Sequence, residues 1–254
     1  MALRFNILGY DSLPSTNTEA ARQAAAGAPE GVAVVAREQT AGRGRQQRAW
    51  ASPRDAGLYF SLVLRPAFEA ARWPLITLAA ALAVHDALRE ACLLKTDIKW
   101  PNDLLARGRK LCGILAETAE TPRGRACVLG VGINLNDRAF PPDLEGRATS
   151  VEAEAGRAPD REALLRSLTR ALDFWYTALG GDDGARRVVV AWESRSSYAR
   201  GARVRVRLAG ETFDGLTRGL EPDGALRVET DARQIRIVRA GDVTAVRAVN
   251  RKRP

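Results

Sequence analysis

The sequence is poor in the residues that many enzymes use for nucleophilic or metal chemistry. It contains one histidine, His85, and three cysteines, Cys92, Cys112 and Cys127, among 254 residues. A single histidine excludes a zinc protease of the HExxH type. An odd number of cysteines without CxxC spacing argues against a disulfide framework or a zinc site, and indicates reduced thiols. We therefore expect a cytoplasmic protein.

Several sequence signals are absent altogether. No apolar run reaches the roughly 18 residues that a membrane helix needs, so we expect no membrane association. The first residues do not form a signal peptide. The P-loop GxxxxGK[ST], the esterase GxSxG, the nucleic-acid-ligase KxDG and a complete GxGxxG are all missing. These absences exclude P-loop NTPases, α/β-hydrolases and Rossmann dehydrogenases.

Lysine is scarce although the chain is basic. Lysine and arginine number 39 against 30 acidic residues, giving a net charge of +9. Only four of the basic residues are lysines, at Lys95, Lys99, Lys110 and Lys252. A basic chain attracts nucleic acid, anionic membranes or phosphorylated substrates, and net charge does not choose among them. An apolar fraction of 46% is typical of a folded globular protein.

The residue pattern predicts an α+β fold. Ser15 or Thr16 can cap a first helix, and Glu19 can complete a capping box with Thr16. Pro74 suits the first turn of a long helix. The predicted helices cover residues 15–27, 73–91, 160–179 and 185–194. The predicted strands cover residues 31–38, 57–65, 96–100, 104–105, 111–117 and 126–136.

The pattern changes near residue 198. Five short alternating runs follow, separated by turn signals such as Asp223-Gly224, at residues 202–209, 212–217, 225–229, 234–239 and 243–248. Five short strands within about 50 residues indicate a small barrel. We therefore expect a large domain over residues 1–198, a small barrel over 199–250 and a tail over 251–254.

Four segments gather residue types that suit chemistry. Glycines and arginines in GRGRQQRAW (42–50) suit an anion, although a solvated loop or a nonspecific RNA-binding patch is an equal interpretation. KWPND (99–103) and RKLCGILAE (109–117) hold two of the four lysines, each of which alone could be an ordinary surface charge. GVGINLN (130–136) places glycines late in a strand, which implies close approach of a neighbour or ligand.

Taken in order, these segments resemble the biotin–protein ligases. The resemblance begins at Ser15-Thr16-Asn17, continues through EQTAGRGR (38–45) and the four segments above, and covers nearly the whole chain. It implies a catalytic domain similar to class II synthetases, with a mixed β-sheet and helices, followed by an SH3-like β-barrel. Many relatives begin with a DNA-binding domain. Here the first motif starts at residue 15, so we expect a monofunctional enzyme without nucleic-acid binding.

The resemblance also implies a reaction in two steps. Biotin and ATP give biotinyl-5′-AMP and pyrophosphate, and the ε-amine of a lysine on a biotin carboxyl carrier protein then takes the biotin. Mg²⁺ is expected on the ATP phosphates, without assigned protein ligands. The sequence does not distinguish a monomer from a homodimer.

Carried over by motif, the resemblance assigns roles to individual residues. Lys110 and Arg45 are the expected catalytic cations. Expected biotin-binding residues are Ser15, Thr16, Asn17, Gln39, Gly42, Arg43, Gly44, Arg45, Lys110 and Gly113. Expected nucleotide-binding residues are Arg45, Arg48, Trp50, Asn102, Asn134 and Arg247. Trp50 is expected to stack on adenine and Asn134 to bond its edge.

One departure and two alternatives accompany this interpretation. The family loop often reads GRGRRGRxW, whereas Gln46 and Gln47 stand here in place of arginine and glycine. We expect weaker retention of the adenylate as a result. A lipoate–protein ligase would share the architecture and the adenylation. A basic nucleic-acid-binding protein is the alternative of a different class, but it leaves KWPND and RKLCGILAE unexplained.

Overall fold

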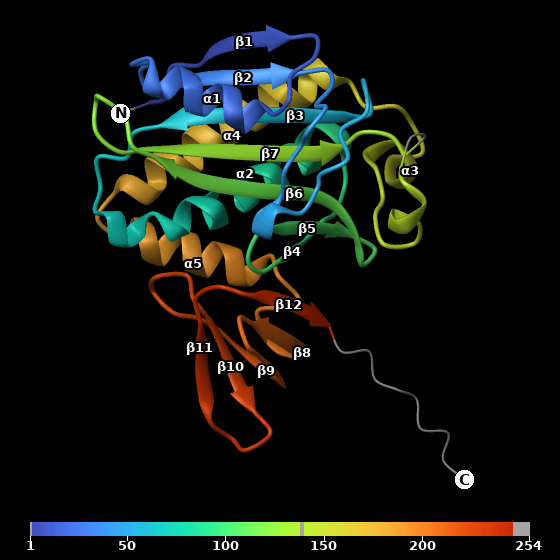
Figure 1. The fold of residues 1–254 in the computed structure, drawn as a ribbon. Helices are drawn as coiled ribbons and strands as arrows, with labels where there is room; N and C mark the ends of the chain where they lie inside the picture. The colour runs from blue at the N-terminus through green and yellow to red at the C-terminus, as the bar shows by residue number, and fades with distance from the viewer. Residues whose placement is uncertain (1, 138–139, 246–254) are drawn as a thin grey trace.

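The computed structural model describes residues 2–137 and 140–245, which form two β-sheets with helices around the larger one (Figure 1). The larger sheet has seven strands in the order β1-β2-β3-β7-β6-β5-β4. Only β1 and β2 run parallel; all other neighbours in this sheet are antiparallel, so the sheet is mixed. The strands are β1 (Asn6–Tyr10), β2 (Val32–Ala36), β3 (Gly57–Leu64), β4 (Asp97–Lys99), β5 (Asp103–Ala106), β6 (Arg109–Ala119) and β7 (Ala126–Asn134).

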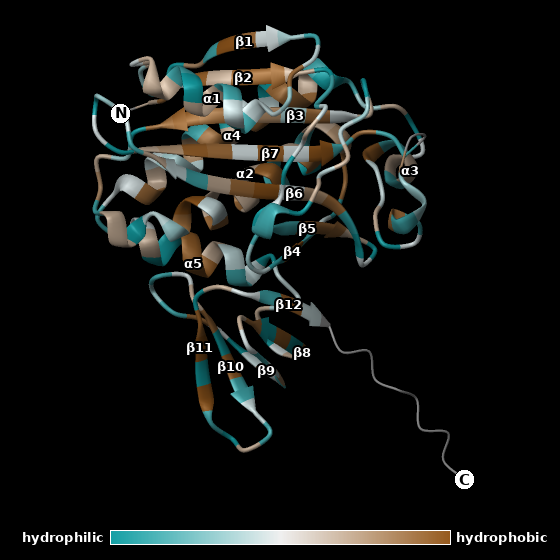
Figure 2. Ribbon diagram, viewed as in Figure 1, coloured by the Kyte–Doolittle hydropathy of each residue, from teal (hydrophilic) through white to brown (hydrophobic). Residues whose placement is uncertain are grey.

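Helices cover both faces of this sheet because its central strands are apolar on both sides. On β3, Leu58, Phe60, Leu62 and Leu64 point into the main core with the long helices, while Val63 points to the opposite side. Helix α1 packs on that opposite side. The helices are α1 (Thr16–Ala25), α2 (Pro74–Cys92), α3 (Val151–Ala155), α4 (Arg161–Gly180) and α5 (Gly184–Ser194). Figure 2 shows the hydrophobic residues concentrated on the central strands and on the helix faces that meet them.

The smaller sheet is antiparallel and has the order β11-β10-β9-β8-β12. Its strands are β8 (Arg200–Leu208), β9 (Glu211–Leu220), β10 (Leu226–Thr230), β11 (Ile235–Val238) and β12 (Asp242–Ala245). Buried residues of this sheet, including Val204, Val206 and Val228, belong to the same apolar cluster as the long helices. The buried indole of Trp100 also donates a hydrogen bond of 3.0 Å from Nε1 to the Gly224 carbonyl. The two sheets therefore share one core.

The α+β class, with a mixed sheet, helices and a small C-terminal β-domain, is confirmed. The sequence analysis missed β1 and the short helix α3. The predicted capping box is wrong, because Ser15 makes no side-chain cap and the Thr16 hydroxyl bonds Gln39 instead. Glu19 bonds Arg22, Gln23 and Tyr10.

Three further expectations concern the chain as a whole. The three cysteines are unpaired and buried, as expected. Within residues 2–137 and 140–245, no helix is long and apolar enough to cross a membrane. The tail 251–254 and Arg247 lie outside the described residues, so their expected roles stay predictions.

Candidate active site

A cavity of about 870 Å³ lies where the larger sheet meets the smaller one. Strands β6 and β7, helix α1, the loop after β2 and strands β8 and β12 all contribute to its walls. Of the 15 site residues expected from the sequence, 13 line it. They are Ser15, Thr16, Asn17, Gln39, Arg43, Gly44, Arg45, Arg48, Trp50, Asn102, Lys110, Gly113 and Asn134. Gly42 is not among the lining residues and lies behind this wall, next to the Trp50 carbonyl.

Glycines form the floor of the cavity. Gly113 on β6 is directly opposite Gly132 on β7 in the strand register. A methyl group on Gly113 would lie 2.9 Å from Trp50 Cζ3, and one on Gly132 would lie 2.7 Å from Trp50 Nε1. A methyl group on Gly130 would lie 2.2 Å from Asn17 Oδ1. Any larger residue would therefore displace the side chains that lie on this floor, as the late-strand glycines predicted.

A hydrogen-bond network fixes the polar side chains at one end of the floor. The Thr16 backbone N–H and hydroxyl both donate to Gln39 Oε1, at 2.8 and 3.0 Å. Gln39 Nε2 donates to Ser52 Oγ at 2.7 Å. Ser61 Oγ donates to Asn17 Oδ1 at 2.6 Å and lies 2.8 Å from Thr16 Oγ1. At this end of the cavity, amide and hydroxyl groups are held in fixed positions beside apolar surface. This is the usual composition of a small-molecule site.

Glu117 completes this network from β6. Asn17 Nδ2 donates to Glu117 Oε2 at 2.7 Å. Arg43 Nη2 lies 3.4 Å from the same oxygen. The carboxylate thereby fixes the orientation of the Asn17 amide.

Lys110 lies at the start of β6, in the middle of the cavity wall. Its ammonium is 2.6 Å from Asp103 Oδ1 and 5.2 Å from the centroid of the Trp50 ring. The side chain of Lys110 is about one-third exposed. A compact cation with a carboxylate on one side and an aromatic face on the other is held in place, yet stays open to the cavity.

The loop between β2 and β3 folds back on itself. Trp50 N donates to the Gly42 carbonyl at 2.9 Å, and Gly44 N donates to the Arg48 carbonyl at 2.7 Å. A side chain at Gly42 would meet the Trp50 carbonyl at 2.5 Å, so this position requires glycine. At the tip, Gln46 and Gln47 both have positive φ, 55° and 58°. Left-handed backbone is unfavourable for glutamine, by roughly 1 kcal/mol or more per residue.

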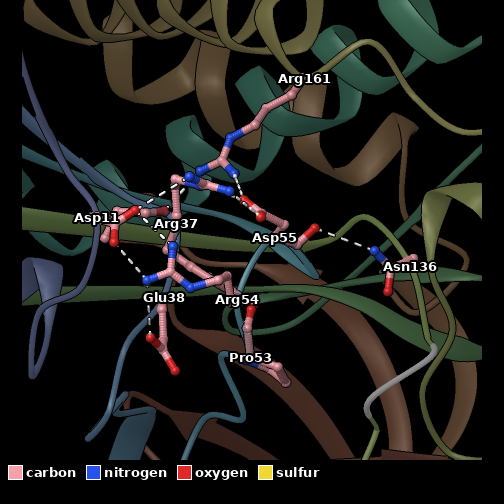
Figure 3. A network of polar contacts seen from close by, with 10 residues as sticks. Asp11, Arg37, Glu38, Pro53, Arg54, Asp55, Asn136 and Arg161 are labelled. Carbon is pink, nitrogen blue, oxygen red and sulfur yellow. Dashed lines mark hydrogen bonds and ion pairs between the residues drawn. The ribbon is translucent and has the colours of Figure 1, made fainter.

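The far end of this loop is anchored by a network of charges (Figure 3). Arg54 forms two hydrogen bonds of 2.7 Å with Asp11. Arg37 forms two bonds, of 2.9 and 2.6 Å, with Asp55. Arg161 of α4 approaches Asp55 at 3.6 Å. These ion pairs thus hold both ends of the loop in place, next to β2 and next to β3.

Two arginines connect the loop tip to the smaller sheet. Arg45 Nη1 donates to the Gly241 carbonyl at 3.2 Å and lies 3.4 Å from Asn102 Oδ1. Arg48 forms an ion pair with Asp242 at the start of β12. Burial lowers the pKa of the Arg45 guanidinium, and the nearby charges of Asp242 and Asp103 only partly oppose this effect. Arg45 and Arg48 therefore lie at the boundary between the two sheets, whereas the third expected loop cation, Arg43, pairs with Glu117.

The two expected asparagines are engaged within the protein. Asn102 Nδ2 donates to the Ile114 carbonyl at 2.7 Å. Asn134 is buried, and its Nδ2 donates to the Thr149 carbonyl at 3.0 Å. Asn134 thus fixes the segment after β7. Its expected contact with adenine stays a prediction.

Sequence reasoning missed several residues that line the cavity. One group comes from the irregular segment after β7, namely Phe140, Leu144, Gly146, Arg147 and Ala148. This segment forms a parallel bridge between Ala148 and Lys110. A second group comes from the wall around the domain boundary, namely Lys99, Asp103, Tyr198, Arg207, Asp242, Val243 and Thr244. The lysine in KWPND was the only available signal for this group, because the other contacts join distant parts of the sequence.

The cavity is strongly cationic. Seven cations line it, against two carboxylates, Asp103 and Asp242. Among the described residues, no group of three or more His, Cys, Asp or Glu could hold a metal ion. Each of the two lining carboxylates is paired with a cation, Asp103 with Lys110 and Asp242 with Arg48. A wall with this excess of cations suits a bound anion.

These features define a binding cleft with fixed polar groups at one end and a cation-rich wall beyond them. The comparisons identify the class of protein. Residues 9–134 match the Biotin/lipoate A/B protein ligase family, and residues 201–244 match the Biotin protein ligase C terminal domain. The chain belongs to the Biotin/lipoate A/B protein ligase family.

Individual relatives extend this likeness over most of the chain. A Bifunctional ligase/repressor BirA of Bacillus subtilis is 38% identical over 89% of this chain and 70% of its own length. A Biotin--[acetyl-CoA-carboxylase] ligase of Mycobacterium tuberculosis is 37% identical over 92% of this chain and 86% of its own. Among solved structures, the biotin protein ligase of Aquifex aeolicus in complex with biotin and ATP is 28% identical, with a TM-score of 0.82. That match covers 94% of this chain and 97% of the other.

Proposed function

We propose that this protein is an ATP-dependent biotin–protein ligase. The carboxylate oxygen of biotin attacks the α-phosphorus of ATP. The bond from that phosphorus to the bridging oxygen of the β-phosphate breaks, giving biotinyl-5′-AMP and pyrophosphate. The ε-amine of a carrier lysine then attacks the acyl carbon of the mixed anhydride. An amide forms, AMP leaves, and the amine loses a proton.

The observation that carries this proposal is the arrangement along one cavity. Amide and hydroxyl groups of Thr16, Asn17 and Gln39 lie at one end, a glycine floor follows, and Lys110 stands beyond it. Biotin has a polar ureido ring, an apolar body and a carboxylate, and the cavity offers matching surfaces in that order. Two anions must meet near Lys110, and a fixed cation lowers the cost of that meeting.

The proposal also assigns individual roles. We assign Ser15, Thr16, Asn17 and Gln39 to the ureido end, and Lys110 to the charge that develops between carboxylate and α-phosphate. Arg43, Arg45 and Arg48 supply loop cations, and Gly42, Gly44 and Gly113 allow close approach. Trp50, Asn102 and Asn134 form the nucleotide side, and the loop 41–50 shields the anhydride from water.

The partners and conditions of the reaction are part of the same proposal. Mg²⁺ accompanies ATP and neutralises part of the phosphate charge. The acceptor is a lysine on a biotin carboxyl carrier protein, the class of protein that biotin ligases modify. Cytoplasmic location is supported by the three buried, unpaired cysteines, which suit a reducing compartment.

Biotin-dependent exchange between ATP and pyrophosphate tests the function, with lipoate as the comparison acid. Exchange with biotin alone supports the proposal. Exchange with lipoate alone would retain the adenylation chemistry and overturn the substrate. If folded protein catalysed neither exchange, the proposed function would be wrong, and salt-dependent binding of nucleic acid would be tested next.

A further inference from the structure

Strand β8 presents three successive outward-facing arginines, and two of them are neutralised. Arg203 pairs with Asp231, and Arg205 pairs with Asp214, its cross-strand neighbour on β9. Arg207 is opposite Thr212 on β9, which carries no charge. On its other side Arg207 is opposite Asp242, whose carboxylate pairs with Arg48. Among the described residues, the Arg207 guanidinium therefore has no acidic partner.

Of these three arginines on β8, Arg207 is the one that lines the cavity. Strand β8 alternates, so Val204 and Val206 fill the core while the arginines stand on the opposite face. Arg205 and Arg207 thus share a strand and an orientation, but differ in pairing and in access to the cavity. Within residues 2–137 and 140–245, Arg207 is thus a cation without an acidic partner at the side of the cavity that the smaller sheet forms.

Lys99 provides a second free cation from the larger sheet. It ends β4 and lines the same cavity. No side-chain hydrogen bond or ion pair holds its ammonium within residues 2–137 and 140–245. Burial lowers the pKa of Lys99, and the nearby charges of Asp103 and Asp242 only partly oppose this effect. A half-buried cation without an acidic partner is costly, and a bound anion would offset that cost.

We propose that Lys99 and Arg207 together hold the pyrophosphate portion of ATP during adenylation. This inference rests on the proposed function. Lys110 lies where the carboxylate and α-phosphate would meet, and its ammonium already has Asp103 as a partner. Asp242 lies opposite Arg207 in the strand register, and it lines the same cavity as Arg207 and Lys99. Oxygens of the β- and γ-phosphates would accept from both cations, and pyrophosphate would leave toward this boundary.

Measuring the two half-reactions separately distinguishes binding of the pyrophosphate portion from a structural role. Biotinyl-5′-AMP has no β- or γ-phosphate, so transfer of its biotin to a carrier domain needs neither Lys99 nor Arg207. We expect Lys99→Gln and Arg207→Gln each to raise the KM for pyrophosphate in the exchange assay by about tenfold or more, as loss of a hydrogen bond to a charged group predicts. Transfer from added biotinyl-5′-AMP should stay within about twofold of wild type.

Arg205→Gln is the matched control, because it removes the same kind of side chain from the same strand outside the cavity. Its KM for pyrophosphate should not change. An unchanged KM in both Lys99→Gln and Arg207→Gln would overturn the proposal. Equal loss of exchange and transfer would also overturn it, since that pattern indicates a structural role. Absence of exchange in the wild-type protein would instead refute the proposed function itself.

Discussion

At the scale of the residue, the position of Lys110 decides how its charge can be used. Asp103 holds the ammonium from one side at 2.6 Å, and the Trp50 ring lies on the other. An arginine in its place would be larger and would spread its charge over a planar fork. A compact ammonium can instead serve two oxygens of different molecules at one point. Its attachment to a strand, rather than to the loop, keeps that point fixed.

Replacement of this cation should stop the first half-reaction. We expect Lys110→Ala to lower biotin-dependent exchange by about 100-fold or more, because an electrostatic contact of this kind supplies several kcal/mol at the transition state. The fold should be retained, since a partly exposed ion pair contributes about 1 kcal/mol or less. Lys95→Ala is the control, because Lys95 is exposed and does not line the cavity. Near wild-type exchange in Lys110→Ala would contradict the assignment.

Glu19 should make the stability of the protein depend on acid pH. Hydrogen bonds from Arg22, and also from Gln23 and Tyr10, lower the pKa of this carboxyl to about 2. The ionised form is therefore favoured in the folded protein, so its contribution is present above about pH 4.5 and is lost as the pH falls toward 2. Urea unfolding at pH 7 and pH 3 should show a loss of about 1 kcal/mol from this group.

The variant Glu19→Gln isolates that contribution. Its free energy of unfolding should be lower than that of wild type at pH 7. Between pH 5 and pH 3, in the same buffers, this free energy should change less with pH than it does in wild type. Glu120→Gln is the control, since that side chain is exposed and its ion pair is with Arg125, a surface residue outside α1. If Glu19→Gln kept the full wild-type pH dependence, the stabilising role of Glu19 would be refuted.

At the scale of the element, the loop between β2 and β3 connects the two sheets of the site. Its tip bonds the smaller sheet through Arg45 and Arg48, while its last residues bond Arg37 and Asp11. The two glutamines at the tip adopt left-handed backbone. The loop therefore combines fixed ends with a strained tip, which suits a segment that opens and closes.

The glutamines of the tip should affect how long the adenylate is retained. We expect Gln46→Arg to slow the release of preformed biotinyl-5′-AMP several-fold, because it adds a cation to the loop tip between Arg45 and Arg48, which both line the cavity. A chase with excess unlabelled biotin and ATP measures this release. Gln23→Arg on α1 adds the same charge outside the cavity, and it should have no effect. Faster or unchanged release in Gln46→Arg would contradict the expectation.

Elements with strong periodicity were predictable from the sequence, and weak ones were not. The apolar runs of β2, β3 and β7 and the long helices α2 and α4 lie where the pattern placed them. Strand β1 was missed because it has only five residues and its adjacent apolar residues Ile7 and Leu8 break the alternation in the sequence. Helix α3 has only five residues, too few for a helical period. The capping box failed because Gln39, which is distant in sequence, competes for the Thr16 hydroxyl.

Site residues that lie in sequence motifs could be predicted. Contacts between residues that are distant in the sequence could not. Asp103 and Lys110 lie within named segments, but their ion pair depends on the register between β5 and β6. Arg48 and Asp242 are 194 residues apart. A site role for Arg207 could not be predicted from the sequence, since an outward-facing arginine on a strand is usually paired with an acidic residue. Only the strand neighbours distinguish it from Arg205.

At the scale of the whole molecule, the smaller sheet is part of the catalytic fold rather than an appendage. Its valines join the apolar cluster of the large domain, and β12 supplies part of the cavity wall. Trp100 is buried in the KWPND segment and donates to the Gly224 carbonyl. The segment that carries site residues Lys99 and Asn102 thus also holds the smaller sheet. Folding of the two parts should be a single event.

Removal of that one hydrogen bond should weaken both parts together. We expect Trp100→Phe to lower the free energy of unfolding by about 1–3 kcal/mol, because the buried Gly224 carbonyl loses its donor. The Tm should fall by several degrees while the transition stays single. Trp192→Phe is the control, since the buried Nε1 of Trp192 has no partner among the described residues. Two separate transitions in Trp100→Phe would disprove the shared core.

The contact of Trp50 with bare glycine backbone gives the cleft a built-in optical reporter. The indole lies on Gly113 and Gly132, with the Lys110 ammonium over its ring. A ligand that draws Lys110 away or lifts the indole changes the polarity and charge around the fluorophore. Occupancy of the cleft can then be followed from the emission of the unlabelled protein, and Trp50→Phe would identify this residue as the source of the signal.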